Sequence, residues 1–222
     1  MKHFIFSSTA ATYGIPEVIP VAEDMPTRPI NPYGMSKLMT EAMLADVAAA
    51  HPINYCALRY FNVAGADPAG RSGQSTAGAT HLIKVAVEAA LGKRAGIEIF
   101  GTDFDTPDGT GVRDYIHVTD LADAHLHALD LLMRDPKASH IMNCGYSRGF
   151  SVNEVLDAVD RVAGVTIARK LSPRRAGDPD ALVANNARIL DRTQWQPRHA
   201  DLDGIVADAL KWERHLSQRN AG

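Results

Sequence analysis

The sequence predicts an α/β fold built around a largely parallel sheet. Three observations lead to this prediction: short apolar stretches alternate with segments of helical periodicity, the chain is 222 residues long, and 45% of its residues are hydrophobic and 22% charged. Strands that alternate with helices are typical of parallel sheets covered by helices. This length and composition suit one large domain or two small ones.

Five stretches have the length and apolar character of buried strands. The first begins almost at the N-terminus, and its continuous apolar run is typical of a parallel strand with neighbours on both sides. We therefore expect the sheet to have further strands that this chain does not contain. The five predicted strands are HFIFSS (3–8), NYCALRYF (54–61), GIEIF (96–100), RDYIHV (113–118) and HIMNCG (140–145).

Five segments between and after these strands have helical periodicity. Asn31-Pro32 is a common entry to a helix, Thr119-Asp120 is a cap, and Ser151 with Glu154 forms a capping box in a helix that ends at Gly164. The predicted helices cover residues 33–50, 80–91, 119–133, 151–164 and 201–216. The loops 62–79 and 101–111 are rich in proline and glycine, and we expect them to build a site.

Composition excludes several classes of protein. The net charge of −3 argues against a general binder of nucleic acid or membrane surfaces, because such proteins carry a basic excess. We find no signal peptide and no apolar run long enough to span a bilayer, so we expect a cytoplasmic protein. Cys56 and Cys144 lie in apolar stretches without metal-ligand spacing, which is typical of buried reduced thiols.

The segment NPYGMSK (31–37) supplies the first chemical signal. Tyr33 and Lys37 are four residues apart, so they lie on one helix face, where the cation favours the phenolate. Such a phenol can take a proton from a substrate hydroxyl, although surface Tyr-Lys pairs at this spacing are common. Ser7, Ser8 and Thr9 end the first predicted strand, where parallel sheets gather ligands.

Several segments together resemble the extended short-chain dehydrogenase/reductases and, within them, the UDP-glucose 4-epimerase family. The segments are FIFSSTAATYG, NPYGMSK, LRYFNVAGADP, THLI, IEIFGTDFDTPDGTGVRDYIHVTDLADAH, NCGYSRGFSV and PRRAGDPDALVA. The resemblance implies part of a Rossmann-like parallel sheet (residues 1–62 and 113–145). A smaller α/β substrate-binding domain would comprise mainly residues 63–112 and 146–222. It also implies a homodimer that holds NAD and inverts C4 of a UDP-sugar through oxidation, rotation of the 4-keto sugar and re-reduction.

By this resemblance, Tyr33 is the acid and base, Lys37 lowers its pKa and binds the nicotinamide ribose, and Thr9 binds the 4-hydroxyl. The implied NAD-contacting residues are Ser7, Ser8, Tyr33, Lys37 and Tyr60. Related nucleotide-sugar 4,6-dehydratases place Asp-Glu after the threonine. Here Ala10 and Ala11 follow Thr9 and cannot transfer protons, so the pattern favours an epimerase.

The resemblance also implies a UDP-sugar site. Arg113 and Arg175 would bind the pyrophosphate, which suits planar guanidinium groups, and Asp178 would bind a ribose hydroxyl. Further implied contacts are Phe100, His81 and Leu82 at the uracil, Asn62 at the phosphate or sugar, and Leu182 at the sugar's 2-substituent. For Asn62 and His81 a structural role remains open, and Arg174 is interpreted as a solvated neighbour. Leucine at 182 is of intermediate size, so we expect UDP-glucose and UDP-galactose as the main pair and weak activity on N-acetylated sugars.

Two features limit the cofactor chemistry. His117, His125 and His127 lack carboxylate or thiol partners at metal-ligand spacing, so we expect structural histidines and no metal. The sequence also contains neither G-x-G-x-x-G nor G-x-x-G-x-x-G, the glycine-rich turn that binds a dinucleotide. We therefore expect either a truncated chain or a chain whose other half is supplied by a second polypeptide. Alone it should be inactive, purify without NAD, and be poorly stable or self-associate through an exposed sheet edge. Three hypotheses stay open: an epimerase chain, a UDP-sugar-binding remnant without turnover, and a partner that completes another Rossmann half.

Overall fold

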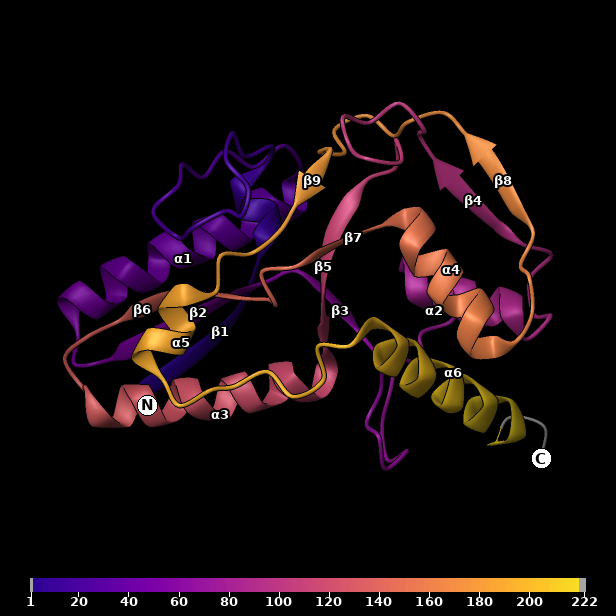
Figure 1. The fold of residues 1–222 in the computed structure, drawn as a ribbon. Helices are drawn as coiled ribbons and strands as arrows, with labels where there is room; N and C mark the ends of the chain where they lie inside the picture. The colour runs from indigo at the N-terminus through magenta and orange to yellow at the C-terminus, as the bar shows by residue number, and fades with distance from the viewer. Residues whose placement is uncertain (1, 220–222) are drawn as a thin grey trace.

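A computed structural model describes residues 2–219 as two groups of elements that lie side by side (Figure 1). The first group is a parallel three-stranded sheet in the order β1-β2-β6, with Thr9 opposite Tyr60 and Tyr60 opposite Cys144. Helices α1 and α3 cover its two faces, and α5 packs on β6. The bounds are β1 His3–Thr9, β2 Asn54–Tyr60, β6 His140–Cys144, α1 Pro32–Ala50, α3 Val118–Arg134 and α5 Ala187–Arg192.

The second group is built around β5. This strand pairs in parallel with β3 and β9 and antiparallel with β7, while β4 and β8 form a separate parallel pair. Three helices pack against one another beside these strands. The bounds are β3 Asn62–Ala64, β4 Ile97–Phe100, β5 Val112–His117, β7 Gly149–Ser151, β8 Arg169–Ser172, β9 Ala181–Leu182, α2 Leu82–Ala90, α4 Val152–Ala163 and α6 Leu202–Arg219.

Helix boundaries follow from local capping. The Asn31 side chain accepts a hydrogen bond of 2.8 Å from the Gly34 amide, with Pro32 at the first helical position of α1. The predicted capping box of Ser151 and Glu154 is present at α4, which ends at left-handed Gly164 as predicted. The predicted Thr119-Asp120 cap is wrong, because α3 already begins at Val118.

The residue that caps α3 is His117. Its Nδ1 accepts the Thr119 amide hydrogen at 3.0 Å, and its backbone is extended where the helix begins. A histidine at the end of a strand is not among the usual capping residues, so this cap could not be predicted from residue type.

The five predicted strands and five predicted helices are all present, with boundaries that differ by one to three residues. The sequence analysis missed β3, β7, β8, β9 and α5, which are two to six residues long. Such short elements carry too few residues for a periodic pattern. The four strands pair with β4 or β5, and α5 packs on β6. The loop expected at 62–79 therefore begins with a strand. Strand β5 pairs with strands of the second group, whereas α3, which follows it directly, covers the first sheet. The expected division of the chain into two domains at residue 113 stays a prediction.

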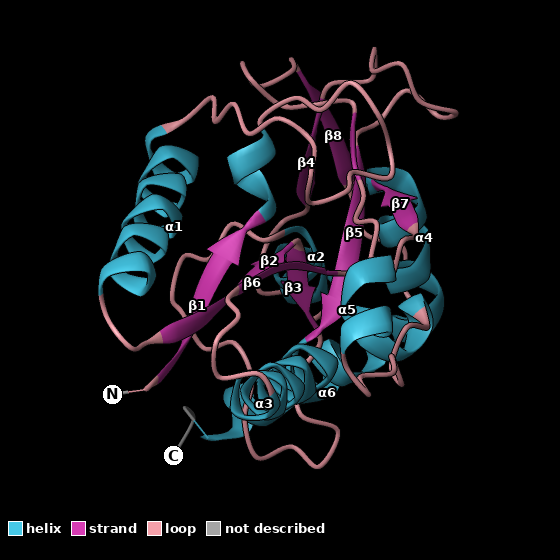
Figure 2. Ribbon diagram, turned by 90° about the vertical axis from the view of Figure 1, so that its left-hand side faces the viewer, coloured by secondary structure: helices cyan, strands magenta, loops and turns pink. Residues whose placement is uncertain are grey.

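Burial differs between the strands of the first sheet. Six of the seven residues of central β2 are buried, whereas the first five residues of β1 are only half-buried. Figure 2 shows β1 in front of β2 and β6, at the edge of the sheet. Among residues 2–219 no strand pairs with the outer side of β1, so the backbone groups on that side lack a ladder partner.

No helix within residues 2–219 is both long enough and apolar enough to cross a membrane.

Candidate functional site

A pocket of about 530 Å³ lies between strands β4 and β5 and the start of α2. Seven residues predicted to bind a UDP-sugar line it together: Asn62, His81, Leu82, Phe100, Arg113, Arg175 and Asp178. They come from four segments that are far apart in the sequence, which the fold brings to one cavity. A volume of this size is within the usual range for small-molecule sites.

Arg113 lies on β5 in the wall of this pocket. Its Nη1 donates a hydrogen bond of 2.8 Å to the Val112 carbonyl oxygen. Burial lowers the pKa of Arg113, and the nearby carboxylates of Asp178 and Asp180 oppose that shift. A half-buried guanidinium with spare donors in a pocket is suited to bind an anion such as phosphate.

Two neighbouring arginines lie over two phenylalanine rings of the pocket. The Arg175 Cζ is 3.7 Å from the centroid of the Phe100 ring. The Arg174 Cζ is 3.9 Å from that of Phe104, and its Nη2 donates to an Asp180 carboxylate oxygen at 2.7 Å. Arg174 is exposed, as expected for a solvated neighbour, although this ring and this ion pair also hold its side chain.

The far end of the pocket opens toward a second hollow of about 430 Å³. Asn62, His81, Leu82 and Tyr115 line both cavities. His81 is exposed, and its Nδ1 lies 2.9 Å from the Gln74 amide nitrogen. This contact supports a structural role for His81 and leaves its other ring nitrogen available at the pocket entrance.

Tyr33 and Lys37 lie on the first two turns of α1. The Lys37 Nζ donates a hydrogen bond of 2.9 Å to the Ser7 carbonyl oxygen, and it is 5.7 Å from the centroid of the Tyr33 ring. The ammonium group is therefore held between the strand end and the phenol. Tyr33 is 54% exposed, so its hydroxyl is accessible.

The turn after β1 lies directly against this part of α1. Thr9 caps a short 3-10 helix, Ala10–Tyr13, and its Oγ1 accepts the Ala11 amide hydrogen at 3.2 Å. A Cβ added to Gly34 would lie 2.5 Å from the Ala11 carbonyl oxygen, so glycine is needed for this close approach. The predicted residues Thr9, Tyr33 and Lys37 are thus carried by two segments in contact.

The other serines at the strand end are engaged elsewhere. Ser8 is fully buried, and its hydroxyl donates to the Glu41 carboxylate at 2.5 Å. Its role in binding the cofactor stays a prediction. The Ser7 Oγ lies 3.4 Å from the His125 Nε2, while its carbonyl oxygen holds Lys37.

The sequence analysis missed the buried ion pair of Glu41 and Arg59. Two hydrogen bonds of 3.0 and 2.5 Å join the Arg59 guanidinium to the Glu41 carboxylate, and both side chains are almost fully buried. Glu41 lies four residues after Lys37, so it anchors the same face of α1 to β2. A charged residue inside the apolar run NYCALRYF was the signal that could have revealed this pair.

The remaining predicted residues lie between the two sites. Tyr60, at the end of β2, is partly buried against the core under the first sheet. Leu182, on β9 opposite Arg113, packs against a cluster that contains Ala10 and Tyr13. Leu182 therefore lies beside the turn that carries Thr9 and next to the strand that carries Arg113.

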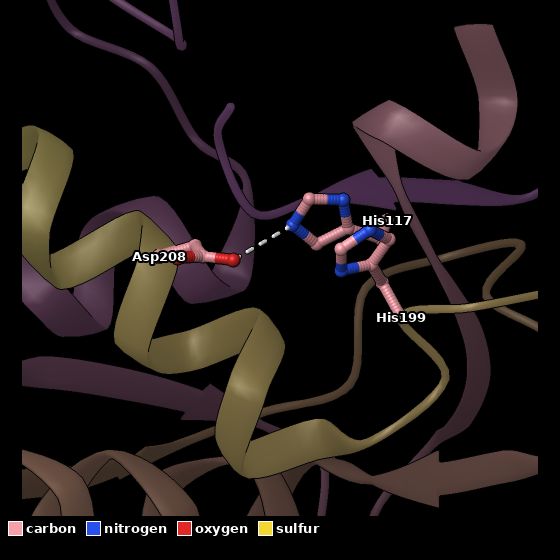
Figure 3. A group of neighbouring side chains, drawn as sticks. All are labelled: His117, His199 and Asp208. Carbon is pink, nitrogen blue, oxygen red and sulfur yellow. Dashed lines mark ion pairs between the residues drawn. The ribbon is translucent and has the colours of Figure 1, made fainter. Parts of the chain in front are cut away.

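Figure 3 shows a third group, formed by His117, His199 and Asp208. The His117 and His199 rings stack at 4.6 Å, and the His117 Nε2 lies 3.3 Å from an Asp208 carboxylate oxygen, too poorly aligned for a hydrogen bond. Because the Thr119 amide hydrogen points at Nδ1, the neutral ring carries its proton on Nε2, where a metal would need a lone pair. Burial also lowers the pKa of His117. The geometry favours a structural contact between α6 and β5.

An α/β fold with parallel strands, a nucleotide-sized pocket and a Tyr-Lys pair at a strand end defines a class of nucleotide-dependent enzymes. The family model described as "NAD dependent epimerase/dehydratase family" matches residues 1–145, and the chain belongs to this family.

Similar proteins agree with this assignment. A UDP-glucose 4-epimerase of Azospirillum brasilense is 60% identical over 96% of this chain and 61% of its own length. The structure of UDP-glucose 4-epimerase from Bifidobacterium longum in complex with NAD+ and UDP has a TM-score of 0.91 and 39% identity, over 96% of this chain and 64% of that one. The UDP-Glc/GlcNAc 4-epimerase of Campylobacter jejuni has a TM-score of 0.80 and 51% identity, over 96% of this chain and 65% of that one. The chain thus spans less than two thirds of the length of these relatives.

Proposed function

We propose that the chain carries the UDP-sugar-binding residues and the proton-transfer residues for NAD-dependent interconversion of UDP-glucose and UDP-galactose. The observation that carries the proposal is the pocket of about 530 Å³, which contains seven of the nine residues expected to contact the sugar nucleotide. The other two do not line it: Thr9 caps the turn after β1, and Leu182, on β9 opposite Arg113, packs against that turn.

The pocket chemistry suits a nucleoside diphosphate. Arg113 and Arg175 offer guanidinium donors to the two phosphate groups, and the Phe100 ring offers a stacking surface to a planar base. The Asp178 carboxylate is an acceptor for a ribose hydroxyl. The Bifidobacterium longum relative, whose structure contains UDP, supports this choice of ligand.

The reaction centre would be formed by Thr9, Tyr33 and Lys37. Thr9 would hold the sugar 4-hydroxyl, Tyr33 would take its proton and later return one, and the fixed Lys37 ammonium would stabilise the phenolate. NAD, when bound, supplies the hydride acceptor and donor. The exposed Tyr33 and the half-buried Lys37 fit the nicotinamide end of this cofactor, whereas the sequence contains no glycine-rich turn for its pyrophosphate.

A second function is favoured by the lack of a glycine-rich turn for NAD in this sequence. The same chain would bind UDP-sugars without turnover, since the pocket in the second group of elements does not depend on the glycine turn. The unpaired outer edge of β1 supports a related role, in which the chain pairs with a second polypeptide or with its own copy.

The proposal is tested with the chain fused to the NAD-binding N-terminal part of the Azospirillum brasilense relative. We expect the fusion to interconvert UDP-glucose and UDP-galactose, and Tyr33→Phe to lower the rate about 100-fold or more, because only the phenolic proton is lost. UDP binding, measured by calorimetry, should be unchanged in the same variant. Full activity of Tyr33→Phe would remove Tyr33 from the mechanism, and a fusion that binds no UDP would refute the proposed pocket.

A further inference from the structure

Arg174 and Arg175 are adjacent in the sequence but are held very differently. Arg174 is fixed twice, by the Phe104 ring and by the Asp180 carboxylate. Arg175 is an exposed residue whose side chain makes no hydrogen bond or ion pair with any residue in 2–219. The Phe100 ring, 3.7 Å from its Cζ, is its one close contact of a specific kind there.

This contact lies inside the proposed nucleotide pocket. Phe100 and Arg175 both line the cavity, together with Arg113 and Asp178. A guanidinium 3.7 Å from the ring centroid covers the ring face that it overlies. A planar base cannot use that face until the guanidinium has moved away.

We propose that Arg175 determines specificity by competing with the base for Phe100, so that the pocket selects nucleoside diphosphates over nucleosides. The inference rests on the proposed function. A nucleoside must displace the guanidinium and gives it no new partner. A nucleoside diphosphate also displaces it, but its phosphates accept the hydrogen bonds of the released guanidinium. The base and the phosphates are therefore recognised jointly through one side chain.

The two ligands should respond to one substitution in opposite directions. In Arg175→Ala, we expect uridine to bind about two- to fivefold more tightly, because an exposed cation–π contact no longer competes with it. We expect UDP to bind about fivefold or more weakly, because the lost charge-assisted hydrogen bonds outweigh that gain. Both affinities are measured on the isolated chain, by calorimetry for UDP and by ligand-observed NMR titration for uridine.

Three further variants separate competition from general damage. Arg174→Ala removes the tethered neighbour, and it should change both affinities in the same direction. Arg175→Lys keeps the charge without the planar group, so it should retain the gain for uridine and lose less affinity for UDP. In a Phe100→Leu background, Arg175→Ala should give no gain for uridine, because the contested ring is absent.

The outcomes distinguish this inference from the proposal on which it rests. If UDP binds but Arg175→Ala weakens uridine binding or leaves it unchanged, competition for Phe100 is refuted and the nucleotide pocket stands. A gain for uridine that persists in the Phe100→Leu background also refutes it. Failure of the unsubstituted chain to bind UDP overturns the proposed function, and this inference with it.

Discussion

The nucleotide pocket and the Tyr33 surface differ in how completely the chain builds them. The pocket is lined by segments between Asn62 and Asp178, and its Arg175 and Phe100 side chains are in contact. The Tyr33 surface is covered on one side only within residues 2–219: Lys37 is fixed on Ser7, while Tyr33 is 54% exposed and β1 lies at the edge of its sheet.

This difference separates binding from chemistry. A ligand can be recognised by residues that are already placed around a preformed pocket. The proton transfer proposed for Tyr33 is useful only when a hydride acceptor is held against it, and within residues 2–219 the Tyr33 side chain is exposed. We therefore expect the isolated chain to bind a nucleotide but not to invert a sugar.

The largest expected effect on stability concerns the buried ion pair of Glu41 and Arg59, which holds α1 against β2. Glu41→Ala leaves the buried Arg59 guanidinium without its carboxylate, and we expect it to lower the free energy of unfolding by about 3–5 kcal/mol. As a matched control, Asp203→Ala breaks the exposed pair with Arg161 and should cost less than about 1 kcal/mol. Urea unfolding followed by circular dichroism measures both. Equal costs would show that the ion pair does not anchor α1.

The next effect concerns the ionisation of Asp114 on β5, the strand that also carries Arg113. This buried carboxylate accepts amide hydrogens from Tyr146, Ser147 and Ala184, yet burial raises its pKa to about 6. The unfolded chain releases this proton near pH 4, so the contribution of Asp114 to stability falls as the pH rises from about 4 to about 6.

The loss over that range is about 2–3 kcal/mol. Asp114→Asn has no such ionisation, so the difference in unfolding free energy between the two chains should change by this amount between pH 4 and pH 7. Urea titrations across that range measure it. A difference that does not vary with pH would show that Asp114 ionises at its ordinary pKa.

The smallest effect concerns the boundary between the two regions, where Leu182 lies. In the fusion, we expect UDP-glucose to be preferred and UDP-N-acetylglucosamine to react weakly. Leu182→Tyr should lower the rate with the N-acetylated sugar about tenfold, because the larger ring fills the space of the acetyl group. Coupled assays on both sugars measure the ratio. Efficient turnover of UDP-N-acetylglucosamine that Leu182→Tyr does not change would refute this role.

The sequence predicts the pocket better than the surroundings of Tyr33. Arg113, Arg175, Phe100 and Asp178 belong to segments that resemble a known family, so their meeting in one cavity was expected. The burial of Ser8 could not be predicted, because it depends on Glu41, which lies 33 residues away in the sequence. Strands such as β8 and β9 also escaped notice, because two to four residues hold no period and their pairing is set by the strands beside them.

The most direct test is a pair of calorimetric titrations of the isolated 222-residue chain, one with UDP and one with NAD. We predict saturable binding of UDP at one site per chain and no measurable binding of NAD, because the pocket residues are already together while Tyr33 is exposed and the sequence lacks the glycine-rich turn. Stoichiometric binding of NAD, or absence of UDP binding in a folded chain, would contradict this account.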